Sequence, residues 1–434
     1  MSRRLLSSGR ADVCIKVTRR SFLCGVFSAL VTLGMLYPSP VAAYEHRRPA
    51  GHHWVGTWST SPMPGEAIFA PPPSSFENQT LRQIVHVSLG GMRVRVRLSN
   101  QMGSEPLTIG AAHLAHQDQG SSIVHCSDRS LTFSGESSIV IQPGEVAVSD
   151  PVLLDVPASS NLAVSLFVPY ATQPSTWHEI GQQTTYIASG DHSGETTLPS
   201  EATATSYFWL SGVDVLSHPN AFSIVAFGDS ITDGVGSTLD LNSRWPDYLA
   251  QRLNTSTDHR YGSIGILNQG ISGNRVLHDF VGPSALSRFE RDVLSQIGVQ
   301  QVFVQIGIND IGLAAAFGIP DQEVTAEQLI AGLEELVDRA HGQGLRVYGG
   351  TLTPCEGTYP GYCSPEQDAT RQTVNDWIRT SSPFDAVVDF DAVLRDPDQP
   401  TRLRPAYDSG DHLHPNDMGY QAMANAIDLH MLLQ

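Results

Sequence analysis

The sequence predicts two parts: an all-β sandwich over residues 44–218 and, over residues 219–434, an α/β domain with a doubly wound, five-stranded parallel sheet. Before about His218, apolar residues recur with the period of two that is typical of half-buried strands, and no convincing helix appears. From Ala221 onward, short and nearly continuous apolar runs alternate with amphipathic helices, which is the pattern of a buried parallel sheet.

The β part is predicted from strands that alternate apolar and polar residues. In Met92–Leu98 the aliphatic residues point to one face and the three arginines to the other. With Leu81–Leu89 on the far side of Gly90-Gly91, this segment predicts a β-hairpin around a two-glycine turn. Three further strands are expected, at Ser138–Ile141, Pro151–Val156 and Leu162–Pro169.

The α/β part contains five candidate strands that are rich in apolar residues along their length: Phe222–Phe227, Ile264–Asn268, Gln301–Ile306, Leu345–Thr351 and Ala386–Phe390. The clearest helix spans Ala326–His341. Thr325 and Gln328 form a capping box at its start, and Gly342 and Gly344 end it. The apolar residues of this helix form one stripe, so we expect it to pack on the sheet.

The charge of the chain limits its partners. Residues 1–43 hold six of the 26 basic residues but one of the 44 acidic residues, so the remainder carries a net charge of −23. Such a chain repels nucleic acid and anionic lipid surfaces, and a neutral substrate fits it better. The sequence gives no indication of the oligomeric state.

Residues 1–43 have the features of a bacterial export signal of the twin-arginine type. Thr18–Leu23 contains the paired arginines, an apolar stretch follows, and Val41-Ala42-Ala43 offers a cleavage site. A membrane anchor is the alternative, but the stretch is shorter than the ~20 residues that a span needs and prolines interrupt it. We therefore expect cleavage and a periplasmic or extracellular protein.

The cysteines fit an exported protein, because disulfides form in oxidising compartments. Cys355 and Cys363 bracket a loop rich in Gly, Pro and Tyr, and a disulfide between them is expected, with two free thiols as the alternative. Cys126 is expected to be unpaired and buried. No spacing of Cys and His matches a zinc site, and no metal or organic cofactor is expected.

Four short polar islands lie beside the apolar runs: Gly228–Ser230, Gly270–Asn274, Gly307–Asp310 and Asp411–Pro415. The first three follow successive predicted strands, and the fourth precedes the last helix. Because ligands bind beyond the carboxyl ends of parallel strands, we expect the islands to converge on one edge of the sheet. Each island taken singly also fits an ordinary turn, a helix cap or a solvated loop. Their combination in this order predicts a site.

The islands carry the groups that acyl transfer to water requires. Ser230 is the candidate nucleophile, and His414 is the candidate base. A tight turn lets Asp411, three residues before His414, accept a hydrogen bond from the imidazole while the other ring nitrogen faces Ser230. The backbone N–H of Ser230, the backbone N–H of Gly273 and the side-chain amide of Asn309 are candidate donors to an oxyanion.

These blocks resemble those of the SGNH (GDSL) hydrolases: Gly-Asp-Ser-Ile at 228–231, Asn-x-Gly-x-x-Gly at 268–273, Gly-x-Asn-Asp at 307–310 and Asp-x-x-His-Pro at 411–415. The resemblance covers residues 221–434. It implies a flavodoxin-like fold and ester hydrolysis through an acyl-enzyme. It also implies the roles given above for Ser230, Gly273, Asn309, His414 and Asp411, with no departure from the family pattern.

Two longer stretches, Ile224–Trp245 and Pro405–His412, are similar to secreted bacterial esterases of this family that are associated with acylated xylan. Trp54–Trp58 resembles the start of the β domain of such enzymes. This similarity implies deacylation, and in particular deacetylation, of a carbohydrate. A lipase, lysophospholipase or arylesterase is the alternative within the family, and a carbohydrate-binding protein with an idle hydrolase site is the alternative of another class.

Five other residues are secondary candidates. Asp408 is an alternative partner for His414. Arg275 and Trp245 are candidates for the wall of a substrate cleft, although a tryptophan such as Trp245 more often packs a helix. Asp229 and Asp310 are expected to anchor loops by accepting backbone N–H bonds, with no part in the chemistry.

Overall fold

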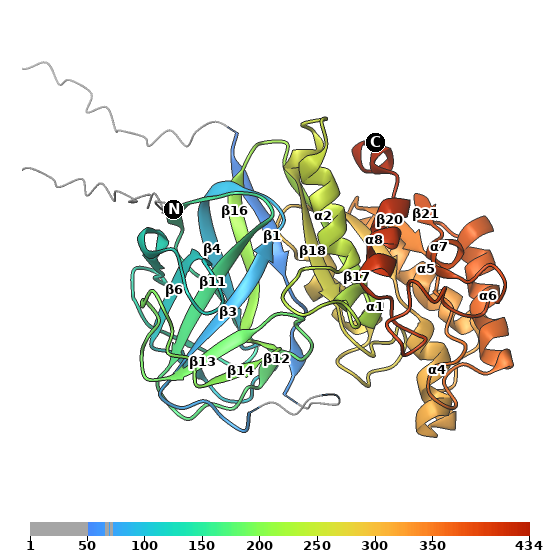
Figure 1. Cartoon of the computed structure of the whole chain (residues 1–434), viewed down its shortest axis with the longest axis horizontal. Coiled ribbons are helices and arrows are strands. Elements are labelled where there is room, and N and C mark those ends of the chain that lie inside the picture. The colour runs from blue at the N-terminus through green and yellow to red at the C-terminus, as the bar shows by residue number, and fades with distance from the viewer. Residues whose placement is uncertain (1–50, 66–68, 70–72) are drawn as a thin grey trace, which may run out of the picture. The chain divides into compact units, whose positions relative to one another are not determined.

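The computed structural model describes residues 51–65, 69 and 73–434 (Figure 1). The chain from Gly51 to Gln434 forms one compact unit. The export signal predicted over residues 1–43 lies outside the described residues. Within the described part, no helix combines the length and the apolar character that crossing a membrane requires.

The β part consists of two packed antiparallel sheets, as the sequence predicts. One sheet contains β1 (His53–Ser59), β16 (Leu210–Ser217), β4 (Gly91–Ser99), β10 (Val152–Val156) and β9 (Val146–Val148). The other contains β14 (Ala202–Ala204), β13 (Thr185–Ser189), β3 (Gln79–Val87), β11 (Ser160–Val168), β6 (Ala111–His116) and β7 (Arg129–Ser130). Buried residues of both sheets, such as Val94 and Val164, belong to one hydrophobic core, which makes this part a β-sandwich.

Shorter strands complete the β part. Three of them form a small sheet: β2 (Met63–Pro64), β12 (Thr176–His178) and β15 (Tyr207–Phe208). Two others pair with each other: β5 (Leu107–Ile109) and β8 (Ile139–Ile141).

The predicted hairpin between Leu81–Leu89 and Met92–Leu98 is wrong, although both strands form. β3 pairs with β11 and β13 in one sheet, whereas β4 pairs with β10 and β16 in the other. Neither Gly90 nor Gly91 has the positive φ that a type I′ turn requires. A Cβ on Gly90 would lie 2.7 Å from Val156 O, and a Cβ on Gly91 would lie 2.7 Å from Val215 Cβ. These glycines therefore allow close packing where the chain passes from one sheet to the other.

The α/β part is built on a parallel sheet with the order β18-β17-β19-β20-β21. Its strands are β17 (Phe222–Gly228), β18 (Ile264–Gly270), β19 (Val299–Gln305), β20 (Arg346–Gly350) and β21 (Ala386–Val388). Its helices are α1 (Ser230–Asp233), α2 (Trp245–Thr255), α3 (Ala285–Phe289), α4 (Ile308–Phe317), α5 (Ala326–Gly342), α6 (Pro365–Thr380), α7 (Phe390–Leu394) and α8 (Asp417–Ala426). The predicted doubly wound fold is confirmed.

Successive residues of β17 pack on opposite faces of this sheet. Val225 and Phe227 belong to the core that includes residues of α3, α5 and α6, whereas Ile224 and Ala226 belong to the core that includes residues of α2 and α8. Burial on both faces explains the nearly continuous apolar run in the sequence. The predicted capping box between Thr325 and Gln328 is present at the start of α5.

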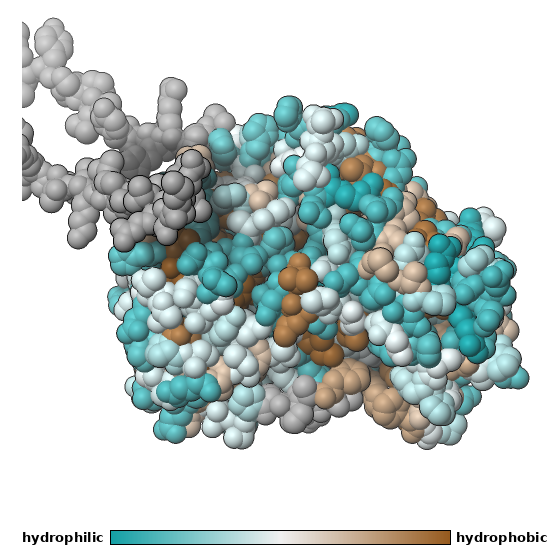
Figure 2. All heavy atoms as spheres, viewed as in Figure 1, coloured by the Kyte–Doolittle hydropathy of each residue, from teal (hydrophilic) through white to brown (hydrophobic). Residues whose placement is uncertain are grey.

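The two parts share an extensive polar junction along β1 and β18, which lie beside each other (Figure 1). Gly56 N donates to Ile297 O at 2.9 Å, and Ser223 Oγ donates to Gly56 O at 2.9 Å. A Cβ on Gly265 would lie 2.7 Å from Gly56 O, so only glycine permits this approach. The outer surface in Figure 2 is mainly hydrophilic, with apolar side chains gathered near its centre.

Candidate active site

The candidate nucleophile lies where β17 passes into α1. Gly228 is in register with Gly270 on one side and Gln305 on the other, so three strands end at the same level. Asp229 is the N-cap of α1, and its Oδ1 accepts from Ile231 N at 3.1 Å. This short turn places Ser230, which is only 5% exposed, at the carboxyl edge of the sheet.

His414 and Asp411 meet Ser230 from the loop before α8. His414 Nε2 lies 2.8 Å from Ser230 Oγ, across 184 positions of the chain, and His414 Nδ1 lies 2.6 Å from Asp411 Oδ2. Asp411 Oδ1 accepts from the backbone N–H groups of Leu413 and His414 at 2.9 and 2.8 Å, which closes the tight turn expected from the spacing. The structure thus brings the three predicted residues together.

The contacts of His414 define the direction of proton transfer. Burial tends to raise the pKa of Asp411, but the interactions with the His414 ring and with the backbone N–H groups of His414 and Leu413 together outweigh burial and hold that pKa well below its usual range. The ionised carboxylate can only accept, so His414 Nδ1 carries a proton. In the neutral imidazole, Nε2 is then the acceptor, and the Ser230 hydroxyl donates to it. The hydroxyl proton therefore already points to the base.

Two candidate oxyanion donors lie on loops next to Ser230. Gly273 has a φ of +77°, and a Cβ there would lie 2.6 Å from Val281 Cγ2, so both backbone and space favour glycine. Asn309, in the first turn of α4, donates from Nδ2 to Asn274 O at 3.0 Å. Ser230, Gly273, Asn309 and His414 line the same cleft.

Tyr362 fixes the orientation of the Asn309 amide, and the sequence did not single it out. Its hydroxyl donates to Asn309 Oδ1 at 2.7 Å. Burial raises the pKa of Tyr362, so the hydroxyl keeps its proton and remains a donor. Because the oxygen of the amide faces Tyr362, the NH₂ group faces the loop that contains Gly273.

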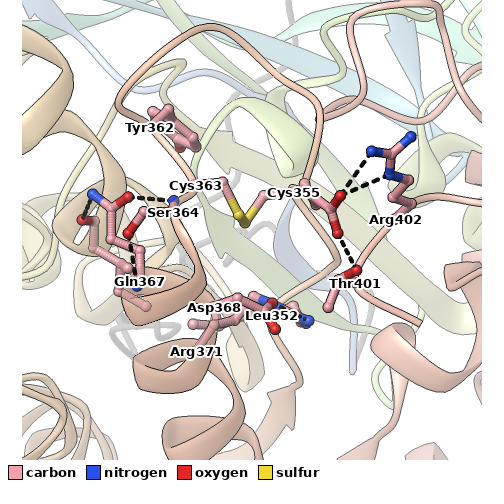
Figure 3. The surroundings of a disulfide bond; sticks show 12 residues. Leu352, Cys355, Tyr362, Cys363, Ser364, Gln367, Asp368, Arg371, Thr401 and Arg402 are labelled. Atoms are coloured by element: carbon pink, nitrogen blue, oxygen red, sulfur yellow. Dashed lines mark hydrogen bonds and ion pairs between the residues drawn. A yellow bond between two sulfur atoms is a disulfide. The ribbon is translucent and has the colours of Figure 1, made fainter. Parts of the chain in front are cut away.

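The Cys355–Cys363 disulfide is present in the structure and closes the loop that carries Tyr362 (Figure 3). On one side of this loop, Glu356 binds Arg402 at 2.7 Å. Asp368 is the third residue with a ligand atom within 4.8 Å of both sulfurs, but the disulfide leaves no thiolate to bind a metal. Cys126 is exposed and disulfide-bonded, so the expectation that it is buried and unpaired is wrong.

The two secondary aspartates anchor loops as expected. Asp310 accepts from the backbone N–H groups of Val276 and Leu277 at 2.7 and 3.0 Å, which ties the oxyanion loop to α4. Burial raises the pKa of Asp229 to about 7 and that of Asp310 to about 6. Both carboxyl groups are therefore fully buried groups whose backbone hydrogen bonds do not offset the effect of burial.

The other secondary candidates do not reach the cleft. Asp408 pairs with His412, at 2.5 Å, and not with His414. Arg275 binds Gln322, and Trp245 is fully buried against Phe303 and Phe390. The expectation that Arg275 lines the cleft is wrong, because its side chain packs inside the domain, and Trp245 takes the alternative role of packing its helix against the sheet.

The cleft beside Ser230 has a volume of about 350 Å³ and a mainly apolar wall. Besides the polar residues named above and Ser272, the wall consists of Phe69, Ile180, Val235, Phe280, Val281, Leu313, Phe317, Tyr359 and Leu413. Phe69 and Ile180 come from the β part, so both parts of the chain form this cleft. No charged side chain is among the described residues that line it.

Residues 226–422 match the model of the GDSL-like lipase/acylhydrolase family. The α/β part is a GDSL (SGNH) hydrolase domain. The protein is therefore a hydrolase that acts on esters, with an all-β region ahead of the hydrolase domain. No curated protein matches the chain.

Solved structures similar to this chain cover about half of it. An alpha/beta hydrolase from the metagenome of Lake Arreo is 26% identical, covers 48% of this chain and 94% of its own, and has a TM-score of 0.37. An acetylxylan esterase from Geobacillus stearothermophilus is 24% identical over 47% of this chain and 91% of its own, with a TM-score of 0.36. A putative arylesterase from Agrobacterium tumefaciens is 17% identical over 49% of this chain and 98% of its own, with a TM-score of 0.37.

The hydrogen bond from Tyr362 to Asn309 predicts a selective loss of rate. Tyr362→Phe frees the Asn309 amide to rotate, and a buried hydrogen bond of this kind is worth about 1.4 kcal/mol, so we expect kcat to fall about tenfold with KM almost unchanged. Steady-state kinetics with a p-nitrophenyl ester measure both constants. Tyr348→Phe is the matched control, because it removes another buried tyrosine hydroxyl, which donates to Met431 O at 3.0 Å. Equal kcat in both variants contradicts the role of Tyr362.

Proposed function

We propose that this protein is an exported serine esterase that hydrolyses carboxylic esters through an acyl-enzyme on Ser230. His414 Nε2 takes the hydroxyl proton while Ser230 Oγ attacks the ester carbonyl carbon. The backbone N–H groups of Ser230 and Gly273 and the Asn309 amide stabilise the oxyanion. As the intermediate collapses, the C–O bond to the alcohol breaks and the alcohol leaves with the proton of His414. Water then attacks the acyl carbon as His414 takes one of its protons. The bond from the acyl carbon to Ser230 Oγ breaks, the acid leaves, and His414 returns the proton to Ser230 Oγ.

The observation that carries this proposal is the continuous hydrogen-bonded chain from Ser230 Oγ through His414 to Asp411, at 2.8 and 2.6 Å. Binding of a carbohydrate by a protein with an idle hydrolase site would require neither these two distances nor an oriented Asn309 amide. The arrangement therefore favours an active enzyme over that alternative.

Export is supported by the signal predicted over residues 1–43. The Cys355–Cys363 disulfide adds support, because such bonds persist in the oxidising compartments outside the bacterial cytoplasm.

For the substrate, the resemblance to xylan-associated esterases implies carbohydrate esters such as acetylated xylan, and the cleft favours the alternative of an ester with an apolar acyl or aryl group. A sugar against this wall would leave its hydroxyl groups without partners, at a cost of about 1–3 kcal/mol for each buried group. An acetyl group would leave most of the cleft unfilled. We therefore rank apolar esters first and carbohydrate esters second.

The proposed mechanism predicts that Ser230→Ala lowers the kcat for p-nitrophenyl acetate by at least about 10⁴-fold, because it removes the hydroxyl that donates to His414 Nε2. Ser237→Ala removes a neighbouring hydroxyl, which donates to Gly234 O at 2.6 Å, and should leave kcat unchanged. Circular dichroism and the thermal midpoint confirm that both variants are folded. Turnover by folded Ser230→Ala at the wild-type rate refutes the assignment.

The apolar wall predicts a preference among acyl chains. Each additional methylene buried in the cleft is worth about 0.8 kcal/mol, so kcat/KM for p-nitrophenyl esters should rise about fourfold per methylene from acetate until the cleft is filled. Acetate release from acetylated xylan, assayed in parallel, should be slow. A maximum at acetate together with rapid deacetylation of xylan would reverse the ranking of the two substrate classes.

A further inference from the structure

A histidine of the β part, His178 at the end of β12, is linked to the oxyanion loop through Asp233. His178 Nε2 lies 3.0 Å from Asp233 Oδ1. Asp233 Oδ2 in turn accepts from both Ser272 N, at 3.0 Å, and Ser272 Oγ, at 2.6 Å. The side chains of His178 and Asp233 are 4% and 3% exposed, so this network is shielded from water.

The partners of His178 show that the imidazole is charged. Its Nδ1 lies 3.0 Å from Ser61 O, a carbonyl that can only accept, so Nδ1 carries a proton. A second proton must lie between Nε2 and Asp233, and imidazole is more basic than a carboxylate. Burial opposes the charge, but the charge of Asp233 and the hydrogen bonds to Asp233 and Ser61 O together outweigh burial and raise the pKa of His178. The pair is therefore a buried imidazolium–carboxylate.

Asp233 connects this ion pair to the reaction centre. Asp233 is the last residue of α1, three positions after Ser230, and Ser272 directly precedes Gly273. The two hydrogen bonds to Asp233 occupy the N–H and the O–H of Ser272. They fix the oxyanion loop to the helix that carries the nucleophile, so the Gly273 amide has a defined position relative to Ser230 Oγ.

A second set of contacts holds the same segment of the β part against the sheet. Ser61 Oγ donates to Gln269 Oε1 at 2.6 Å and accepts from Arg288 at 2.9 Å. The same guanidinium donates to Gly228 O and Gln269 O, at the ends of β17 and β18. Ser61, which accepts from His178, is therefore itself fixed to the strands that precede Ser230 and the oxyanion loop.

From these contacts we propose that the β part completes the catalytic machinery: His178 is a positioning residue that holds the Gly273 amide in place through Asp233 and Ser272. This inference rests on the proposed esterase function and assigns a new role to the β part. The β part is then no detachable binding module, because the oxyanion loop depends on a side chain that it supplies.

The effect is expected in the transition state more than in substrate binding. Without His178, Asp233 becomes a buried carboxylate that lacks its hydrogen-bonded cation, and it must move toward water or another donor. A displacement of about 1 Å in a reacting geometry can cost about 10²-fold in rate. The ground-state ester makes weaker contacts with the oxyanion donors, so KM should change little.

The test compares His178→Ala with His113→Ala, which removes another histidine of the β part that pairs with an aspartate, Asp128, at 3.0 Å. We expect His178→Ala to lower kcat about 100-fold with KM within about twofold of wild type, and to weaken phenylboronic acid, which forms a tetrahedral adduct with the serine, by a similar factor. His113→Ala should behave as wild type. Unchanged kcat and boronate affinity in folded His178→Ala overturn the inference. A loss of activity that equals the fraction of unfolded protein overturns it as well.

Two conservative variants keep the test decisive if His178→Ala does not fold. His178→Gln can still donate to Asp233 but lacks the charge, so its kcat should fall about tenfold at unchanged KM and thermal midpoint. Asp233→Asn can accept from Ser272 and donate to a neutral His178, so it should retain most of the activity. A wild-type kcat in His178→Gln contradicts the inference. Asp233→Ala is the comparison for Asp233→Asn, and an equal loss of kcat in these two variants also contradicts it.

The pH profile is a readout that a purely structural role would not change. Because the pKa of His178 is raised, the ion pair is present at lower pH and is lost as the pH rises through that pKa, so kcat should decline on the alkaline side. The other titratable or charged groups that face the pair are Arg244 at the N-cap of α2, Tyr207 opposite His178 on β15, Arg288 of α3, Asp229 at the N-cap of α1 and Tyr420 of α8. The decline should be absent in Asp233→Asn, and an identical alkaline limb in that variant contradicts the inference.

The inference and the esterase function fail in different ways. Turnover by the wild-type protein that is lost in Ser230→Ala establishes the esterase, whatever the result for His178. If the wild-type protein hydrolyses no ester, the proposed function fails before His178 is examined.

Discussion

The hydrogen bond between Ser230 Oγ and His414 Nε2 is the interaction on which the rest of the site depends. It joins the loop after the first strand of the α/β part to the loop before the last helix. It forms because three parallel strands end in register, and because Asp411 both closes the turn before His414 and orients its ring. Displacement of either loop would leave a buried hydroxyl without a base.

The β part and the α/β part are better understood as one catalytic body than as an enzyme with an appended module. Hydrogen bonds from Gly56 and Ser61 attach the β part to the sheet, and Ile180 extends it into the wall of the cleft. The same junction carries the His178–Asp233 pair. Because residues of the β part line this cleft, the shape of the substrate that fits it depends on the β part as well as on the hydrolase domain.

The sequence predicted the local features well and the distant contacts poorly. Strand ends, the capping box at Thr325 and the polar islands are visible because each is a short pattern with its own physical cause. The pairing of β3 with β4 was wrong, because alternation shows which face of a strand is buried but not which strand lies beside it. His178 and Ile180 carry no local signal, because their partners in the site lie 50 or more positions away in the chain. Tyr362 could have been found, since it lies inside the loop that the two cysteines bracket.

The most direct test of the central claim is covalent labelling of the folded protein with a fluorophosphonate, followed by peptide mass analysis. The reagent reacts with a serine hydroxyl that an adjacent base has activated. The account predicts one adduct, on Ser230, and a much slower reaction after His414→Ala. An adduct on a different residue, or equal rates of labelling with and without the imidazole of His414, would contradict it.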